Sequence, residues 1–85
     1  MKSTWKSNYQ NNEIKIINSW FKGEKLYVND ILQDEKISLV SSTLNGHILG
    51  KDNQKINIKA NLGGFFSVEC SLYVNDEKIE IIKIV

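Results

Sequence analysis

The chain has 85 residues, of which 41% are hydrophobic and 25% charged, enough apolar sequence for one small core without disulfides or a metal. Eleven basic and ten acidic residues give a formal net charge of +1, and the two signs are interspersed along the chain. No charged stripe therefore points to a polyionic partner. Every basic residue is Lys, which lacks the planar fork with which Arg reads phosphates and guanines, and this disfavours a nucleic-acid function.

The expected location is cytoplasmic. Cys70 is the single cysteine and cannot form an internal disulfide, so the fold needs no oxidising compartment. Residues 1–12 contain no apolar run of the kind found in secretory signals, and no segment has the apolar length needed to span a bilayer. The wealth of Ile, Lys and Asn, without Arg or Pro, suggests an AT-rich bacterial or phage genome.

The first third of the chain predicts one strand meander. Residues 1–12 are polar apart from Trp5 and Tyr9, and we expect an edge strand or a loosely held arm. Three strands should follow, over residues 13–21, 25–28 and 31–33, and the last two should be joined by a two-residue turn at Asn29-Asp30.

The middle of the chain is less regular. Residues 34–36 are all charged and predict a loop. Residues 37–49 are rich in Ser, Thr and apolar side chains, with Asn45-Gly46 among them, and predict either one bulged strand or a hairpin.

The last third predicts a second meander. Residues 55–62 alternate between apolar and polar side chains, as a half-buried antiparallel strand does. Gly63-Gly64 should end this strand, and residues 65–74 should form the longest strand of the protein. The turn Asn75-Asp76 then leads into a final Ile-rich strand over residues 78–85.

The two meanders are related, because Leu-Tyr-Val-Asn-Asp occurs at residues 26–30 and again at residues 72–76. No stretch has the ten or more residues at helical period that a stable helix needs. The chain therefore predicts a single all-β domain, an antiparallel sandwich or small barrel of seven to nine strands built from two similar three-stranded meanders.

Two stretches carry a resemblance to a known class of proteins. They run from Asn18-Ser19-Trp20 to Leu26-Tyr27-Val28-Asn29, and from Leu62-Gly63-Gly64-Phe65-Phe66 to Cys70. With the rest of the chain from about residue 13 onward, they resemble small bacterial all-β proteins known only as hypothetical proteins. The resemblance implies an all-β fold and no activity, substrate or catalytic residue.

The sequence predicts no catalytic residue, no metal site and no cofactor. His47 and Cys70 are the only residues of their kind, too few for a zinc site. Cys70 shares the inward parity of its apolar neighbours on the predicted strand and should behave as a small hydrophobe rather than as a nucleophile. The acidic pairs Asp34-Glu35 and Asp76-Glu77 fall in predicted turns, where neighbouring carboxylates usually diverge into solvent.

Outward aromatic side chains form the candidate binding face. Tyr27 and Tyr73 occupy equivalent positions in the repeat and point outward by parity, Phe65 shares the face of Tyr73, and Trp20 is the fourth candidate. The leading hypothesis is a non-catalytic protein-binding or self-assembling module, acting as a homodimer or on a protein partner. The alternatives are a binder of a small ligand or carbohydrate, with Trp5, Trp20 and Tyr27 around a cleft, and a single-stranded nucleic-acid binder of OB type with Phe65-Phe66 as its stacking platform.

The final strand adds one constraint on assembly. Residues 78–85 are apolar on both faces, and a free strand edge of this kind is rarely left uncovered. The cover can be the arm of residues 1–12, the first meander or a second chain.

Overall fold

The computed structural model describes residues 2–19, 22–37, 41–63 and 68–84. These residues form nine strands and one short 3-10 turn, η1 (Lys51–Asn53). The strands are β1 (Lys2–Tyr9), β2 (Asn12–Ser19), β3 (Gly23–Val28), β4 (Ile31–Lys36), β5 (Ser42–Leu49), β6 (Lys55–Gly63), β7 (Glu69–Val74), β8 (Glu77–Ile79) and β9 (Ile82–Lys83).

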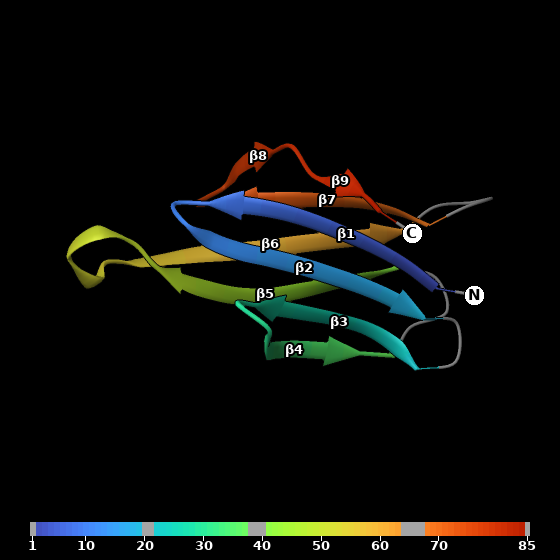
Figure 1. Cartoon of the computed structure of the whole chain (residues 1–85). Helices are drawn as coiled ribbons and strands as arrows, with labels where there is room; N and C mark the ends of the chain where they lie inside the picture. The colour runs from blue at the N-terminus through green and yellow to red at the C-terminus, as the bar shows by residue number, and fades with distance from the viewer. Residues whose placement is uncertain (1, 20–21, 38–40, 64–67, 85) are drawn as a thin grey trace.

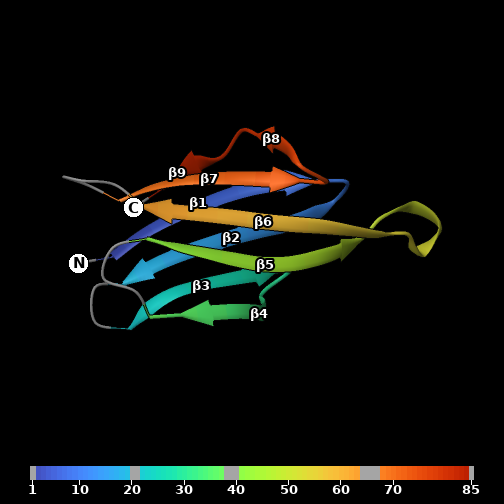
Figure 2. The same ribbon diagram turned by 180° about the vertical axis from the view of Figure 1, so that it is seen from behind.

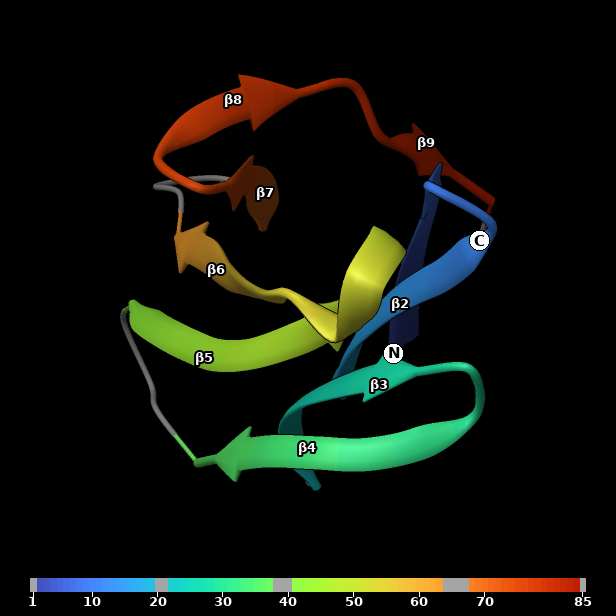
Figure 3. The ribbon, with the colours of Figure 1, turned by 90° about the vertical axis from the view of Figure 1, so that its left-hand side faces the viewer.

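The strands make two antiparallel sheets, a five-stranded sheet in the order β4-β3-β2-β1-β9 and a four-stranded sheet in the order β5-β6-β7-β8. Figures 1 and 2 show the elongated molecule from its two sides, and Figure 3 shows it along its length, with β8 and β9 crossing between the sheets. The predicted all-β sandwich is confirmed.

The core lies between the two sheets because each strand turns alternate side chains inward. In β2 and β6 the inward positions are almost all Ile, Ala or Leu, and these strands form the centre of the core. The buried apolar residues are Trp5, Ile14, Ile16, Leu26, Val28, Leu44, Ile48, Ile56, Ile58, Ala60, Leu62, Leu72 and Val74.

Both predicted Asn-Asp turns are confirmed as two-residue hairpin turns of the primed type. Asn29 and Asp30 have φ angles of 51° and 65°, and Asn75 and Asp76 have φ angles of 50° and 67°. The side chain of Asn29 also accepts a hydrogen bond from the Glu13 backbone N–H, at 2.9 Å, and so ties the turn to the neighbouring strand. Asn75 does the same in the second half of the chain, with a different strand as its partner.

The internal repeat comprises four strands. The predicted three-stranded meanders are β2 to β4 and β6 to β8, and each is extended by the strand that precedes it, β1 and β5. We call β1 to β4 the first repeat and β5 to β8 the second repeat. The two repeats make most of the five-stranded sheet and all of the four-stranded sheet.

Strands β4 and β5 test two expectations about the middle of the chain. The predicted loop at residues 34–36 is wrong: β4 continues to Lys36, with Glu35 paired to Lys25 of β3. This pair of opposite charges across the ladder favours the strand. For the segment 37–49, β5 is one strand that runs through Asn45-Gly46 with an unbroken register against β6, so the predicted hairpin there is wrong and the described strand has no bulge. Residues 38–40 lie outside the described part of the chain.

The predicted final strand over residues 78–85 is wrong as a single element. Its first part, β8, pairs with β7, and its second part, β9, pairs with β1 in the other sheet. The chain crosses between the sheets because Ile79 and Ile81 both pack against the core from this side. For the predicted strand over residues 65–74, the described part is β7, and residues 64–67 lie outside the described part of the chain.

Strand β1 covers the C-terminal strand. It lies inside its sheet, between β2 and β9, and so is neither an edge strand nor a loose arm. The backbone N–H of Ile84 donates to the Thr4 carbonyl at 2.8 Å, and the Ser7 hydroxyl donates to the Glu80 carbonyl at 3.0 Å. Of the three covers considered above, the N-terminal segment is the one present in the structure.

At the opposite side of the sandwich, side chains of β4 bond to the backbone of β5. The Gln33 amide donates to the His47 carbonyl at 2.8 Å and accepts from the His47 N–H at 2.7 Å. Asp34 accepts from the Asn45 N–H at 2.8 Å. These bonds replace a backbone ladder between the two strands, and we call this junction the β4–β5 seam.

The seam depends on a bulge and a glycine. The register of β4 against β3 shifts beside Leu26, so that Gln33 is the extra residue of a β-bulge and its side chain is re-aimed. Gly46 lies where the Gln33 amide reaches β5, and a Cβ at Gly46 would overlap Gln33 Oε1. The missing side chain of Gly46 is therefore what allows the amide to approach.

We expect Gly46→Ala to destabilise the domain by about 1–3 kcal/mol, because the new methyl group displaces Gln33 from His47. Urea denaturation measures this cost in the native sequence and in a Gln33→Ala background. The cost should be smaller in the Gln33→Ala background, since the overlapping amide is gone. An equal cost in both backgrounds would show that the glycine does not serve the seam.

Candidate functional site

The candidate tyrosines occupy equivalent outer positions on different sheets. Tyr27 lies opposite Lys15 in the ladder, with the Lys15 ammonium 5.3 Å from the ring centroid. Tyr73 lies opposite Lys59, with the corresponding distance at 5.6 Å. Each ring is half-buried under the cation, a favourable cation–π arrangement. The two tyrosines point away from opposite sides of the sandwich, so they do not form one binding face.

The other predicted aromatic residues do not complete a site. Phe65 and Trp20 lie outside the described residues. Trp5, expected beside a carbohydrate cleft with Tyr27, is buried in the core, because its ladder partner Ile16 points inward. Since Trp5 points inward and Tyr27 outward, these two residues do not line one cleft.

His47 and Cys70 lie on opposite faces of the four-stranded sheet. Cys70 is half-buried, packs against the core and is paired with the buried Leu62. His47 is exposed on the outer face of β5. Desolvation by burial raises the pKa of the Cys70 thiol from 9.0 to about 12, so the thiol is protonated at neutral pH. This geometry offers no Cys-His nucleophile.

The acidic side chains are dispersed. Asp34 is bound to the backbone of β5, and Asp30 forms an ion pair with Lys15 at 3.3 Å. In residues 2–19, 22–37, 41–63 and 68–84, no group of three His, Cys, Asp or Glu side chains lies close enough to hold a metal ion.

Glu24 is a buried carboxylate that the sequence reading did not single out. It is only 4% exposed, accepts a hydrogen bond from the Asn18 amide at 3.3 Å through Oε1, and has no partner at Oε2. The alternation of Glu24, Leu26 and Val28 places all three on the inner face of β3, and this parity was the available signal. The carboxylate lies opposite Lys36 in the ladder.

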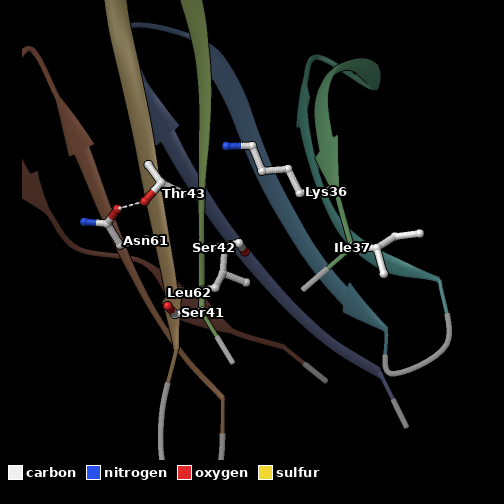
Figure 4. Close-up of a pocket in the computed structure, with 7 residues that line it drawn as sticks. All are labelled: Lys36, Ile37, Ser41, Ser42, Thr43, Asn61 and Leu62. Carbon is white, nitrogen blue, oxygen red and sulfur yellow. Dashed lines mark hydrogen bonds between the residues drawn. The ribbon is translucent and has the colours of Figure 1, made fainter. Parts of the chain in front are cut away.

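A pocket of about 690 Å3 opens near the same end of the sandwich, between the end of β4 and strands β5 and β6. Figure 4 shows its described lining, with the Thr43 hydroxyl bonded to Asn61 at 2.9 Å; the lining residues are Lys36, Ile37, Ser41, Ser42, Thr43, Asn61 and Leu62. Lys36 is the one charged side chain among these residues. The lining therefore offers hydroxyl and amide groups, but no pair of acid and base.

Exposed apolar side chains lie at both edges of the outside of the five-stranded sheet. Leu32 of β4 is 44% exposed, and Ile82 and Ile84 at β9 are 68% and 49% exposed. Their ladder partners place all three outward, where Tyr27 and Ile17 are half-buried between them. We call these five residues the apolar outer face.

The outer face of the four-stranded sheet is mostly polar. Its described positions along β5, β6 and β7 include Thr43, Asn45, His47, Asn57, Lys59, Asn61, Ser71 and Tyr73. The two sheets thus present different chemistry to their surroundings, although the repeats that build them share one plan.

Comparisons with protein-family models, with curated proteins and with solved structures gave no match for this chain. The resemblance noted from the sequence therefore stays an expectation. In the part of the chain that the structure describes, no helix is long and apolar enough to cross a membrane.

We expect Cys70 in the folded protein to react with a bulky thiol reagent at least about a hundredfold more slowly than in urea, because the reactive thiolate is scarce and shielded. The raised pKa also affects stability. Since the folded thiol keeps its proton between pH 9.0 and about 12 while the unfolded thiol loses it, the free energy of unfolding falls as pH rises through this interval.

The pH profile of Cys70→Ala gives the control, because lysines and tyrosines titrate in the same range in both proteins. The difference between the two profiles should show the fall attributed to Cys70. Labelling of the native protein as fast as that of the unfolded protein would place the thiol on the outer face instead.

Proposed function

We propose that this domain is a non-catalytic protein-binding module that self-assembles, packing the apolar outer face of its five-stranded sheet against a second copy of the chain. The observation that carries the proposal is the exposure of Ile82 and Ile84 side by side at β9, with Leu32 exposed at the other edge of the same face, on β4. Lys6 and Lys15 lie between these two apolar edges, and exposed apolar side chains rimmed by polar ones are typical of an interaction site.

The strand edges favour a face rather than an edge as the contact. The long edges β4 and β5 are joined by the side chains of the seam, and β9 is paired with β1. The remaining described edges, at β8 and β9, are only three and two residues long, and short edges of this kind resist pairing with another chain.

The charges on the same face favour a protein partner. Lys6 lies 3.5 Å from Glu13, Lys15 lies 3.3 Å from an aspartate, and Lys25 is opposite Glu35 in the ladder. Each of these lysines has an acidic neighbour, so the face has little net field with which to attract a nucleic acid. Mixed charges around apolar residues also allow two copies to complement each other.

The size of the face fits a small dimer contact. The longest strands of the five-stranded sheet have eight residues, about 26 Å, and its five strands span about 19 Å, so the face offers roughly 500 Å2. Two such faces bury about 1,000 Å2, the low end for a specific protein interface.

Light scattering combined with size-exclusion chromatography tests the proposal. The unaltered chain should be a dimer, and Ile82→Lys and Ile84→Lys should each give a folded monomer, because a buried unpaired ammonium opposes association. Leu49→Lys is the matched control: Leu49 is 57% exposed on the outer face of the other sheet, and this variant should remain dimeric.

Circular dichroism establishes that each variant is folded before its mass is compared. A chain that stays monomeric at high concentration contradicts self-assembly. A dimer lost in Leu49→Lys, but not in the Ile82 and Ile84 variants, would move the contact to the four-stranded sheet.

A further inference from the structure

The outer face of the four-stranded sheet contains a hollow of about 250 Å3 over strands β5, β6 and β7. Polar side chains surround it: the amides of Asn45 and Asn57, the ammonium of Lys59, the carboxylate of Asp76 and the ring of Tyr73. The hollow lies on the side of the molecule opposite the apolar outer face.

The first repeat shows how the same ladder positions are used on the other sheet. There the row across the strands reads Lys6, Lys15 and Tyr27. Lys6 is paired with Glu13 at 3.5 Å, and Lys15 is paired with Asp30 at 3.3 Å. The charges of the first repeat therefore satisfy one another.

In the second repeat the corresponding row reads Asn45, Lys59 and Tyr73. Two amides, Asn45 and Asn57, stand where the first repeat has the Lys6–Glu13 ion pair. Neither amide side chain has a hydrogen bond to any described residue, and Lys59 and Asp76 form no ion pair there. The second repeat therefore has the same tyrosine, lysine and aspartate as the first repeat. Its neighbouring polar side chains, however, are not paired with one another.

The groups around the hollow define the chemistry of a ligand. One ammonium, one carboxylate and two amides supply both donors and acceptors, with no net charge. A group that donates and accepts at once, such as a hydroxyl, can pair with every one of them. Neighbouring hydroxyls on a ring suit the amides, and the apolar side of such a ring can pack on the edge of Tyr73.

We propose that this hollow is a binding site for one ring of a neutral saccharide. Its volume of about 250 Å3 is below the roughly 300 Å3 at which pockets for larger ligands begin, which fits a single ring. The carboxylate of Asp76 disfavours anionic ligands, and Lys59 disfavours cationic ones. The site lies on the opposite sheet from the proposed dimer contact and does not depend on it.

The test is a titration of the full-length, 15N-labelled chain with glucose, galactose, mannose and N-acetylglucosamine, followed by amide chemical shifts. At least one sugar should shift the amides of Asn57, Lys59 and Asp76 saturably at millimolar concentrations. Asp76→Asn should weaken that sugar's binding about tenfold, because a hydrogen bond to a charged group is lost while the turn is kept.

Asp30→Asn is the matched control, because it makes the same change at the same turn position in the first repeat and should leave the affinity unchanged. Methyl glycosides of the bound sugar distinguish two sources of the ring. An affinity equal to that of the free sugar identifies a ring within a glycan, and loss of binding identifies a free reducing sugar. The proposal is overturned if none of the four sugars shifts these amides, or if Asp30→Asn weakens binding as much as Asp76→Asn does.

Discussion

The sandwich depends on how the backbone groups at its two longest strand edges are satisfied. An unpaired N–H or C=O at a sheet edge invites another strand, yet β4 and β5 belong to different sheets and do not share a ladder. The Gln33 amide solves this by presenting one donor and one acceptor to His47, as a neighbouring backbone residue would. The β-bulge turns the side chain of Gln33 toward β5, and Gly46 leaves room for its amide. The seam needs both features.

The sides of the sandwich are closed, and its two outer faces carry different side chains. At the opposite side, β8 and β9 carry the chain from one sheet to the other, so both sides of the sandwich are bridged. The two repeats keep the same turns and the same Lys-Tyr pairs, and they differ in what surrounds those pairs. In the first repeat the charges pair among themselves beside exposed apolar residues, while in the second the polar groups remain available. One repeated plan therefore gives two outer surfaces with different side-chain chemistry.

The sequence allowed a good part of this fold to be predicted, for physical reasons. Period-two alternation and Asn-Asp turns are local signals, so β2, β3, β6 and the primed turns followed directly. The seam is not local: the charged segment after Gln33 looks like a loop until its aspartate bonds to a strand distant in sequence. The crossing of the final strand was hidden for the same reason, since its two parts have partners at opposite ends of the chain.

The candidate site was predicted less completely than the fold. Parity placed Tyr27 and Tyr73 outward, but it could not show that they face away from opposite sheets. The buried carboxylate of Glu24 was visible in the same parity, whereas the hollow beside Tyr73 depends on the neighbours that β5 brings.

Amide hydrogen exchange at the seam tests the central claim most directly, namely that side chains of β4 stand in for a backbone ladder. In the unaltered protein the amides of His47 and Asn45 should be protected, although both lie on the edge strand of their sheet. In Gln33→Ala the His47 amide should lose its protection while Asn45, bound to Asp34, keeps it. If His47 exchanges at the same rate in both proteins, Gln33 does not close the edge and the account of the seam is wrong.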